Sequence, residues 1–437
     1  MSKRITQLER AMEAALRPGR YIDYRVMADF THGLEQVAAD VKALVRGGHA
    51  DEAIALFETF IAACHEKAEE VDDSDADLGI FVHDLFFHWV RARQSARKKP
   101  EETVKLLVGW MESDDAGFCD GLERDLMKVL NKRGLRAFAT QARARLDAAV
   151  PDDGSWGSYP RRRWTTALKH IYVAQCDAEA YMALAEETTI DSEDCSAVAG
   201  ILEKQGEFEQ ALAWVERGLK LAGGERHSFT QYELGQWRLA LLPRLGRADE
   251  ALAAAWAGFE SSPGTYSYKT LMEFVPEGER DAWHDKAMAA AEEADLPDVI
   301  DLLVLTREVE RLAARVDGAS NRELERMSHY STQPAAELLA KKHSATAARV
   351  FRAMGIRIVG RGKSKYYDAA LGNFEHARDC YAAAGQSAKW DALVAEVRRE
   401  HSRKHSFMPG FERVVKGGTG AEPSFLERAR SRWPRGT

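Results

Sequence analysis

Apolar residues recur at three- and four-residue steps along most of the chain, which is the spacing of one face of an α-helix. The steps are clearest beside a short phrase, a glycine followed five residues later by an alanine, that occurs at 48–53, 206–211 and 246–251. The glycine permits a turn, acidic residues open a second helix, and the small alanine lets two helices approach closely. The pattern predicts helical hairpins, with Gly206 and Gly246 in turns and Ala211 and Ala251 buried on the second helix.

Two stretches interrupt the helical pattern. Residues 151–160 contain two Gly, two Pro and two Ser, and residues 359–365 are glycine-rich and basic; neither composition continues a helix. Past Phe407 the chain turns to Gly, Pro and Arg, which is typical of mobile ends. We therefore predict an N-terminal helical block over 1–150, a linker over 151–165, a helical array over 166–358, a capping hairpin over 359–405 and a basic, mobile tail over 406–437.

The capping hairpin has the clearest apolar faces. Its first helix is expected over about 365–384 and its partner over the segment that follows, because a terminal unit of a helical array needs one buried and one polar face. The expected buried residues are Tyr366, Tyr367, Ala370, Leu371, Phe374, Ala377 and Tyr381 on the first helix, and Trp390, Leu393, Val394 and Val397 on the second.

The glycine and alanine phrases resemble the second helix of the tetratricopeptide repeat. The first-helix signature differs, because Cys195, Val198 and Ala199 stand where that repeat prefers Trp, Leu and Gly, and the 40-residue step between two phrases exceeds the usual length of about 34. Units of this kind stack to bury their apolar faces. The expected fold class is all-α, an α-solenoid of tetratricopeptide-like helical hairpins.

Several further phrases cover nearly the full length: 21–24, 71–75, 206–211, 215–218, 246–251, 363–370 and 403–408. In these the chain resembles an uncharacterised bacterial family of tetratricopeptide-like proteins with a domain of unknown function, found alone or downstream of a SWIM-type zinc finger. The C-x-C and C-x-H pairs of that finger are absent from the sequence, so its zinc or nucleic-acid role does not transfer. The resemblance implies an all-α, bacterial, cytoplasmic protein and brings no known reaction or catalytic residue.

Composition narrows the function classes. The 437 residues are 45% hydrophobic and 30% charged, with 61 basic against 69 acidic side chains, a balance too mild for a dedicated nucleic-acid binder. Five scattered cysteines without a CxxC pair fit a reducing cytoplasm. No signal peptide and no membrane-spanning segment is expected.

The acidic and histidine-rich segment 69–88 offers the main candidate for metal chemistry. Asp73, Asp75 and Asp77 have the first spacings of a calcium loop, but Leu78 stands where the loop needs glycine. We predict that this segment caps the next helix. His83, Asp84 and His88 lie close on that helix without the HExxH spacing of catalytic zinc. No catalytic residue, metal or cofactor is predicted, and a metal-dependent enzyme built on 69–88 is kept as an alternative.

The C-terminal segment is basic, with ten basic and four acidic residues from Arg398 onward. A cluster there could bind an anionic partner, or it could be a solvated helix end. The leading hypothesis is a non-enzymatic helical scaffold that binds a protein or peptide; a nucleic-acid-associated protein using the basic end is the other alternative. The candidate partner-binding residues are Lys363, Lys365, Arg398, Arg399, Arg403 and Lys404.

Overall fold

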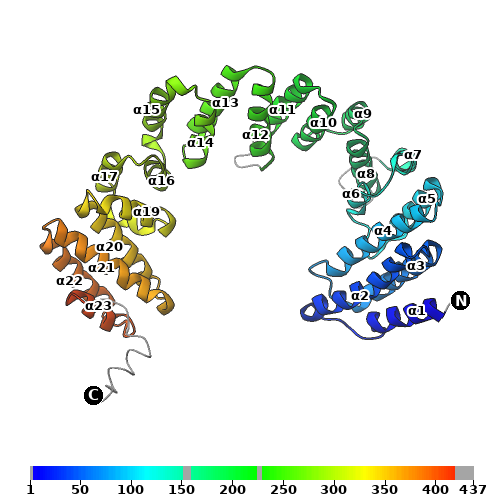
Figure 1. Cartoon of the computed structure of the whole chain (residues 1–437), viewed down its shortest axis with the longest axis horizontal. Helices are drawn as coiled ribbons and strands as arrows, with labels where there is room; N and C mark the ends of the chain where they lie inside the picture. Colours follow the sequence, from blue (N-terminus) through cyan, green and yellow to red (C-terminus); the bar gives the residue numbers. More distant parts are fainter. Residues whose placement is uncertain (1–2, 151–158, 224–228, 419–437) are drawn as a thin grey trace, which may run out of the picture. The chain divides into compact units, whose positions relative to one another are not determined.

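The computed structural model describes residues 3–150, 159–223 and 229–418, and Figure 1 shows the helices that they form. About 80% of the chain is helical, and the described residues contain no strand, only one isolated bridge between Ile22 and Val71. The chain divides into two compact units, Met1–Leu245 and Gly246–Thr437. In each unit, helices pack mainly against their neighbours along the chain. The fold is all-α, an α-solenoid of helical hairpins, as the sequence predicts.

The first unit buries its largest side chains, among them Phe57, Phe60 and Trp89, between its first helices. Its helices are α1 (Lys3–Leu16), α2 (Met27–Arg46), α3 (Ala50–Lys67), α4 (Asp77–Ser95), α5 (Pro100–Ser113), α6 (Leu122–Leu126), α7 (Lys132–Ala148), α8 (Tyr159–Gln175), α9 (Ala178–Glu186), α10 (Ser192–Gln205), α11 (Phe208–Ala222) and α12 (Phe229–Arg244), with short turns η1 (Tyr24–Val26) and η2 (Ala68–Glu70).

The second unit contains the remaining helices. They are α13 (Ala248–Ser261), α14 (Thr265–Phe274), α15 (Arg280–Ala290), α16 (Leu296–Thr306), α17 (Val309–Gly318), α18 (Asn321–Arg326), α19 (His329–Ala340), α20 (Ser344–Gly360), α21 (Tyr367–Ala383), α22 (Ser387–His401) and α23 (Met408–Val415), with turns η4 (Glu277–Glu279), η5 (Ala291–Glu293) and η6 (Ser364–Tyr366). Helices α20 and α21 pack closely, because a Cβ at Gly355 would lie 2.8 Å from the ring of Phe374.

The repeated glycine and alanine phrase has the predicted geometry. Gly206 and Gly246 adopt left-handed backbone angles, with φ of +86° and +73°, which glycine reaches at no steric cost. Ala211 and Ala251 are fully buried near the starts of α11 and α13. The prediction of hairpins with small residues at the close approach is therefore confirmed.

The capping hairpin is confirmed in outline. Helix α21 buries six of its seven expected apolar residues, and α22 buries Trp390, Leu393, Val394 and Val397. Tyr366 is the exception, because it lies in η6, before α21 begins, and is 49% exposed.

The end of the predicted linker 151–165 differs from the structure. Helix α8 begins at Tyr159, because Trp164 and the apolar residues after it pack against the preceding helices; residues 151–158 lie outside the described part. The division into units at Leu245 falls within the predicted array 166–358, whose bounds stay a prediction.

The predicted tail 406–437 begins with a packed helix. In α23 the rings of Phe407 and Phe411 stack with centroids 5.6 Å apart and are completely buried, and Phe374 of α21 contacts both. Arg378 donates to the carbonyl oxygen of Val414 at 2.8 Å, which holds the end of α23. The Gly, Pro and Arg content past Phe407 predicts a mobile end, but Pro409 lies in the first turn of α23, where proline is tolerated. Residues 419–437 lie outside the described part. None of the described helices is at once long and apolar enough to cross a bilayer.

Candidate anion-binding site

The acidic segment caps helix α4, as predicted. The carboxylate of Asp73 accepts hydrogen bonds from the backbone N–H groups of Leu78, at 2.8 Å, and Gly79, at 3.0 Å. Both donors belong to the first turn of α4, which has no partner for them within the helix. Ala76, just before the helix, takes a left-handed φ of +59° that lets the chain fold back over its own start.

The two histidines of α4 contact different carboxylates, and only His88 contacts Asp84. His83 Nδ1 lies 3.2 Å from a carboxylate oxygen of Asp125 on α6, whereas His88 Nε2 lies 3.3 Å from Asp84. Lys42 of α2 donates to the other oxygen of Asp84 at 2.5 Å. Burial acts to raise the pKa of Asp84, but the hydrogen bonds from His88 and Lys42 outweigh it, and the pKa lies below its usual range. In 3–150, 159–223 and 229–418, no three His, Cys, Asp or Glu side chains are grouped as a metal site requires.

The residues of the predicted basic cluster have different roles in the structure. Arg398 makes a two-pronged ion pair with Glu412 of α23, with Nε–Oε1 of 2.8 Å and Nη2–Oε2 of 2.7 Å. The hydrogen bond to Glu412 raises the pKa of Arg398, and the same bond lowers the pKa of Glu412. Arg398 therefore holds α23 against α22. Arg399 pairs with its neighbour Glu400 at 3.1 Å and is exposed.

The other four residues of the predicted cluster lie in the loop after α20 and just beyond the end of α22. A Cβ at Gly362 would lie 3.6 Å from Lys404 Nζ, so Lys404 lies against the loop that carries Lys363. Lys365 places its ammonium group 4.9 Å from the ring centre of Tyr366. Arg403 is exposed just beyond the end of α22. The end of α22 and the loop 361–366 therefore form one basic surface.

A second group of cations, which the sequence analysis missed, lines a recess between α18 and α20. The recess has a volume of about 490 Å³ and contains four arginines and one glutamate. We call it the arginine recess, and its residues are Arg322, Glu325, Arg326, Ile356, Arg357, Gly360 and Arg361. The signal in the sequence is an arginine repeated after four residues, once in 322–326 and once in 357–361.

The arginines of the recess lack carboxylate partners such as those of Arg349 and Arg352 on the same helix α20. Within the described part of the chain, no hydrogen bond or ion pair within 4.0 Å joins any of the four to a carboxylate. The charge of Arg326 does help to lower the pKa of Glu323, whose main hydrogen-bond partner is Ser320. Burial and the neighbouring charge of Arg361 lower the pKa of Arg357. Each helix thus places two like charges four residues apart, an arrangement that disfavours the folded chain.

The one glutamate of the recess, Glu325, forms an ion pair outside the recess. Buried Arg352 of α20 donates to Glu325 of α18 at 2.7 Å and to both oxygens of Glu396 of α22, at 2.6 and 2.9 Å. Burial acts to lower the pKa of Arg352, and the hydrogen bonds that it donates to these two glutamates more than reverse that effect. The three helices are therefore joined at one level by Arg352.

The arginine recess and the basic surface lie at the same end of these helices. Helices α20 and α21 form one hairpin and α21 and α22 the next, so α22 runs in the same direction as α20. From the level of Arg352, Arg357 follows along α20 and Arg361 lies just past its end; likewise Arg399 follows Glu396 along α22 and Arg403 lies just past its end. The positive charges of both groups therefore lie beyond the Arg352 junction.

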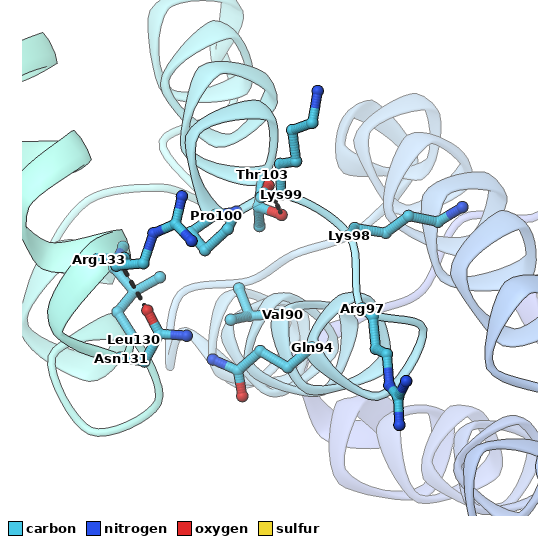
Figure 2. Close-up of a pocket in the computed structure, with 11 residues that line it drawn as sticks. Val90, Gln94, Arg97, Lys98, Lys99, Pro100, Thr103, Leu130, Asn131 and Arg133 are labelled. Carbon is cyan, nitrogen blue, oxygen red and sulfur yellow. Dashed lines mark hydrogen bonds between the residues drawn. The ribbon is translucent and has the colours of Figure 1, made fainter.

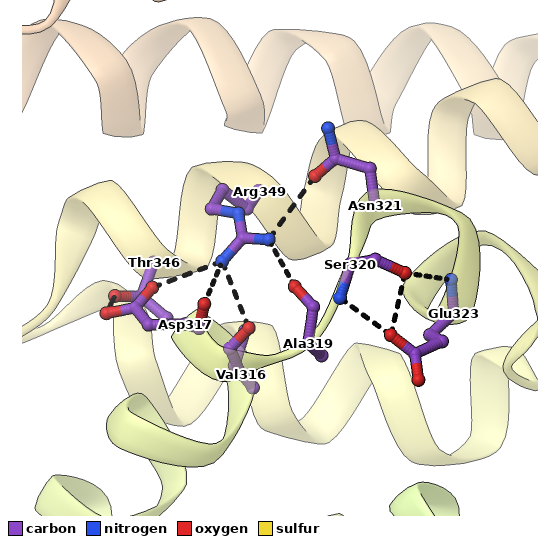
Figure 3. A network of polar contacts seen from close by, with 8 residues as sticks. All are labelled: Val316, Asp317, Ala319, Ser320, Asn321, Glu323, Thr346 and Arg349. Carbon is purple, nitrogen blue, oxygen red and sulfur yellow. Dashed lines mark hydrogen bonds and ion pairs between the residues drawn. The ribbon is translucent and has the colours of Figure 1, made fainter.

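A polar network fixes the helix that carries Arg322 and Arg326 (Figure 3). Arg349 of α20 donates to the carbonyl oxygens of Val316, at 3.0 Å, and Ala319, at 2.6 Å, which end α17 and lead into α18. Ser320 and Glu323 then form a reciprocal capping box that starts α18. The network therefore fixes the start of α18 relative to α20.

The first unit contains a second basic pocket, which we call the α4 pocket. It has a volume of about 310 Å³ and lies where the end of α4 meets the starts of α5 and α7 (Figure 2). Three of its four cations are paired: Lys98 with Asp51 at 2.8 Å, Lys99 with Glu102 at 3.3 Å, and Arg133 with Glu101 at 3.0 Å. In Figure 2 the charged ends of its basic side chains point in different directions.

Comparison with known proteins identifies a family. The sequence matches the family of unknown function DUF6880 over residues 2–409, so the chain belongs to that family. Comparison with curated protein sequences finds no match. Among solved structures, the chain is similar to one described as Naa15/Naa10 bound to HypK-THB, with 16% identity, a TM-score of 0.36, and coverage of 94% of this chain and 66% of that chain, which is less than two thirds of its length. It is also similar to a circular tandem repeat protein with novel repeat topology and enhanced subunit contact surfaces, with 14% identity, a TM-score of 0.20 and 94% coverage of both chains.

Proposed function

We propose that this member of the DUF6880 family is a non-enzymatic helical-repeat scaffold that binds an acidic segment of a protein or peptide partner. The binding surface is the basic end of the second unit, made of the arginine recess together with Lys363, Lys365, Arg399, Arg403 and Lys404. The observation that carries the proposal is that the four recess arginines have no carboxylate partner among the described residues.

Electrostatics supports an anionic partner. Like charges at a spacing of four residues cost an isolated helix about 0.2–0.5 kcal/mol, and both pairs of the recess bear this cost. An acidic ligand relieves the repulsion when it binds, and complementary charge also steers its approach. The protein as a whole is negative, with a formal charge of −8. A positive surface therefore differs in sign from the average charge of the protein, and an acidic partner is attracted to that surface specifically.

The environment of segment 69–88 supports a scaffold over an enzyme. Asp73 caps α4, His83 contacts Asp125, and Asp84 is shared between Lys42 and His88. Each of these polar groups has a structural partner. The metal-dependent alternative would require them to leave those partners and converge.

Fluorescence anisotropy of the full chain tests the proposal, with labelled short peptides of degenerate sequence that are either rich in Glu and Asp or composed of neutral residues. The acidic peptides should bind, and their affinity should fall as salt is added. Charge reversal in the combined variant Arg399→Glu, Arg403→Glu and Lys404→Glu should weaken binding by about tenfold or more.

The matched control reverses the charge at Lys98, Lys99 and Arg133 in the α4 pocket, and acidic-peptide binding should be unchanged. Equal binding of acidic and neutral peptides, or equal loss in both variants, would contradict the proposal. Tight binding of a labelled single-stranded oligonucleotide with no binding of acidic peptides would favour the nucleic-acid alternative.

A further inference from the structure

The chemistry of the arginine recess indicates more than a general preference for acidic residues. All four of its cations are arginines, and none is a lysine. The planar guanidinium group offers paired N–H donors that match two oxygens of one phosphate, whereas a lysine ammonium group acts as a single point of charge. Two such pairs, one from α18 and one from α20, face the same recess.

The charge of the recess calls for a ligand with more than one negative charge. Its lining holds four positive and one negative side chain, a net of +3, and the negative side chain, Glu325, is already paired with Arg352. A carboxylate brings one negative charge, whereas a phosphorylated side chain brings about 1.5 to 2 and three strong acceptor oxygens. A phosphoryl group therefore satisfies more of the available donors than Glu or Asp does.

The recess is built in advance of binding. Arg349 and the capping box of Ser320 and Glu323 hold α18, and Arg352 fixes Glu325 so that it does not compete for the recess arginines. Ile356 adds an apolar side chain to the lining, against which the carbon stem of a ligand residue can pack. The remaining basic surface, with Lys363 and Arg403, is then available to acidic residues that flank the phosphorylated one.

We propose that the arginine recess is the subsite for the phosphoryl group of a phosphorylated side chain in the partner segment. This inference rests on the proposed function, because the same partner segment occupies both the recess and the basic surface. It assigns Arg322, Arg326, Arg357 and Arg361 to the phosphoryl group, and Lys363, Arg399, Arg403 and Lys404 to the flanking acidic residues.

The test uses three sets of degenerate acidic peptides that differ only at the central residue, which is Ser, Glu or phosphoserine. Anisotropy with the full chain should show the phosphoserine set binding at least about tenfold more tightly than the Glu set, a difference that corresponds to about 1.4 kcal/mol. In the variant Arg357→Gln with Arg361→Gln, the phosphoserine and Glu sets should bind within about twofold of each other. In the control variant Lys98→Gln with Arg133→Gln, the tenfold preference should persist.

The outcomes separate this inference from the proposed function. Equal affinity for the phosphoserine and Glu sets would overturn the phosphoryl subsite and leave acidic-segment binding intact, whereas absence of binding by every set would overturn both. If free O-phosphoserine competes as strongly as the phosphopeptides bind, the ligand is a small phosphorylated molecule, and the peptide part of the proposal is wrong. If circular dichroism shows that the Arg357 variant is misfolded, Arg322→Gln with Arg361→Gln, at two exposed positions, replaces it.

Discussion

The α4 pocket and the arginine recess have the same number of basic residues, but those of the α4 pocket are mostly paired with carboxylates and those of the recess are not. Each lies where one helix ends against its neighbours, and each is lined by four cations. In the α4 pocket three of the four have a carboxylate within 3.3 Å, whereas in the arginine recess none is paired within the described part of the chain. The number of basic residues therefore does not identify a binding surface, whereas the carboxylate partners of those residues do.

The two pockets differ in net charge because the glutamates near each pocket pair with different groups. In the α4 pocket, Glu101 and Glu102 stand in the first turn of α5, where the helix dipole favours them, and they remain available to Arg133 and Lys99. In the recess, Glu323 is engaged by the cap at Ser320 and Glu325 by Arg352. The same residue types thus leave one pocket balanced and the other positive.

The largest expected effect is the loss of stability when the buried cation Arg352 is replaced, compared with the more exposed Lys98. Arg352→Met should lower the free energy of unfolding by about 2 kcal/mol, because it leaves Glu325 and Glu396 without their partner. A fully buried pair would cost about 3–5 kcal/mol, but these two glutamates keep 26% and 27% exposure. Urea unfolding of the full chain measures the change. The control Lys98→Met should cost less than about 0.5 kcal/mol, and equal losses would remove the structural role given to Arg352.

A smaller loss of stability is expected on replacing Arg398, a predicted binding residue that instead pairs with Glu412. Arg398→Gln should lower the free energy of unfolding by about 0.2–1 kcal/mol, because its pair with Glu412 is partly exposed to water. Hydrogen exchange should become faster in α23, with little change in α20. Arg403→Gln, at an exposed position two residues beyond α22, is the matched variant. If both substitutions leave exchange in α23 unchanged, Arg398 does not hold that helix.

Removing one arginine charge should change the stability of the protein in opposite directions in the two pockets. Arg361→Gln removes one of two like charges, so it should raise the free energy of unfolding by about 0.2–0.5 kcal/mol. Arg133→Gln removes the partner of Glu101 and should lower the melting temperature slightly or leave it unchanged. Added salt should shrink the difference between Arg361→Gln and wild type. Destabilisation by Arg361→Gln in low salt would show that the recess charges support folding.

The smallest effect concerns His401, which is buried beside the basic surface at the end of α22. Burial and the nearby charge of Lys404 lower the pKa of His401, although Glu396 and Glu400 act in the opposite direction. The unfolded chain therefore binds a proton that the folded chain resists, and stability should fall as the pH is lowered through the ordinary histidine pKa of about 6.5. Urea unfolding on either side of that pH should show a weaker dependence for His401→Gln, and an unchanged dependence would assign the effect to other groups.

The sequence predicts those features of the fold that depend on local patterns. Gly206 and Ala211 lie within one turn and the helix after it, and Asp73 caps a helix that begins four residues later. The spacing of Tyr367, Leu371 and Phe374 likewise predicts α21 from a single segment. In each case the interacting residues are neighbours in the chain, so periodicity and turn chemistry are sufficient.

The site depends on contacts between distant segments, which periodicity does not reveal. Arg326 and Arg357 meet only because α18 packs on α20, and Glu325 is removed from the recess only by Arg352. The sequence predicts Arg398 as a partner-binding residue from its place in the basic C-terminal segment. Once Phe407 and Phe411 fold α23 back onto α21, Glu412 reaches Arg398.

Arginine-specific labelling with phenylglyoxal, read residue by residue by mass spectrometry, tests the central claim most directly. The neutral guanidine attacks the carbonyl groups of the reagent, so exposure, the absence of a carboxylate partner and a lowered pKa all favour reaction. Arg322, Arg326, Arg357 and Arg361 should react several times faster than Arg352, and the degenerate phosphoserine peptides should protect these four selectively. Reaction of the recess arginines as slowly as Arg352, or protection that falls equally on Arg97 and Arg133 of the α4 pocket, would contradict the account.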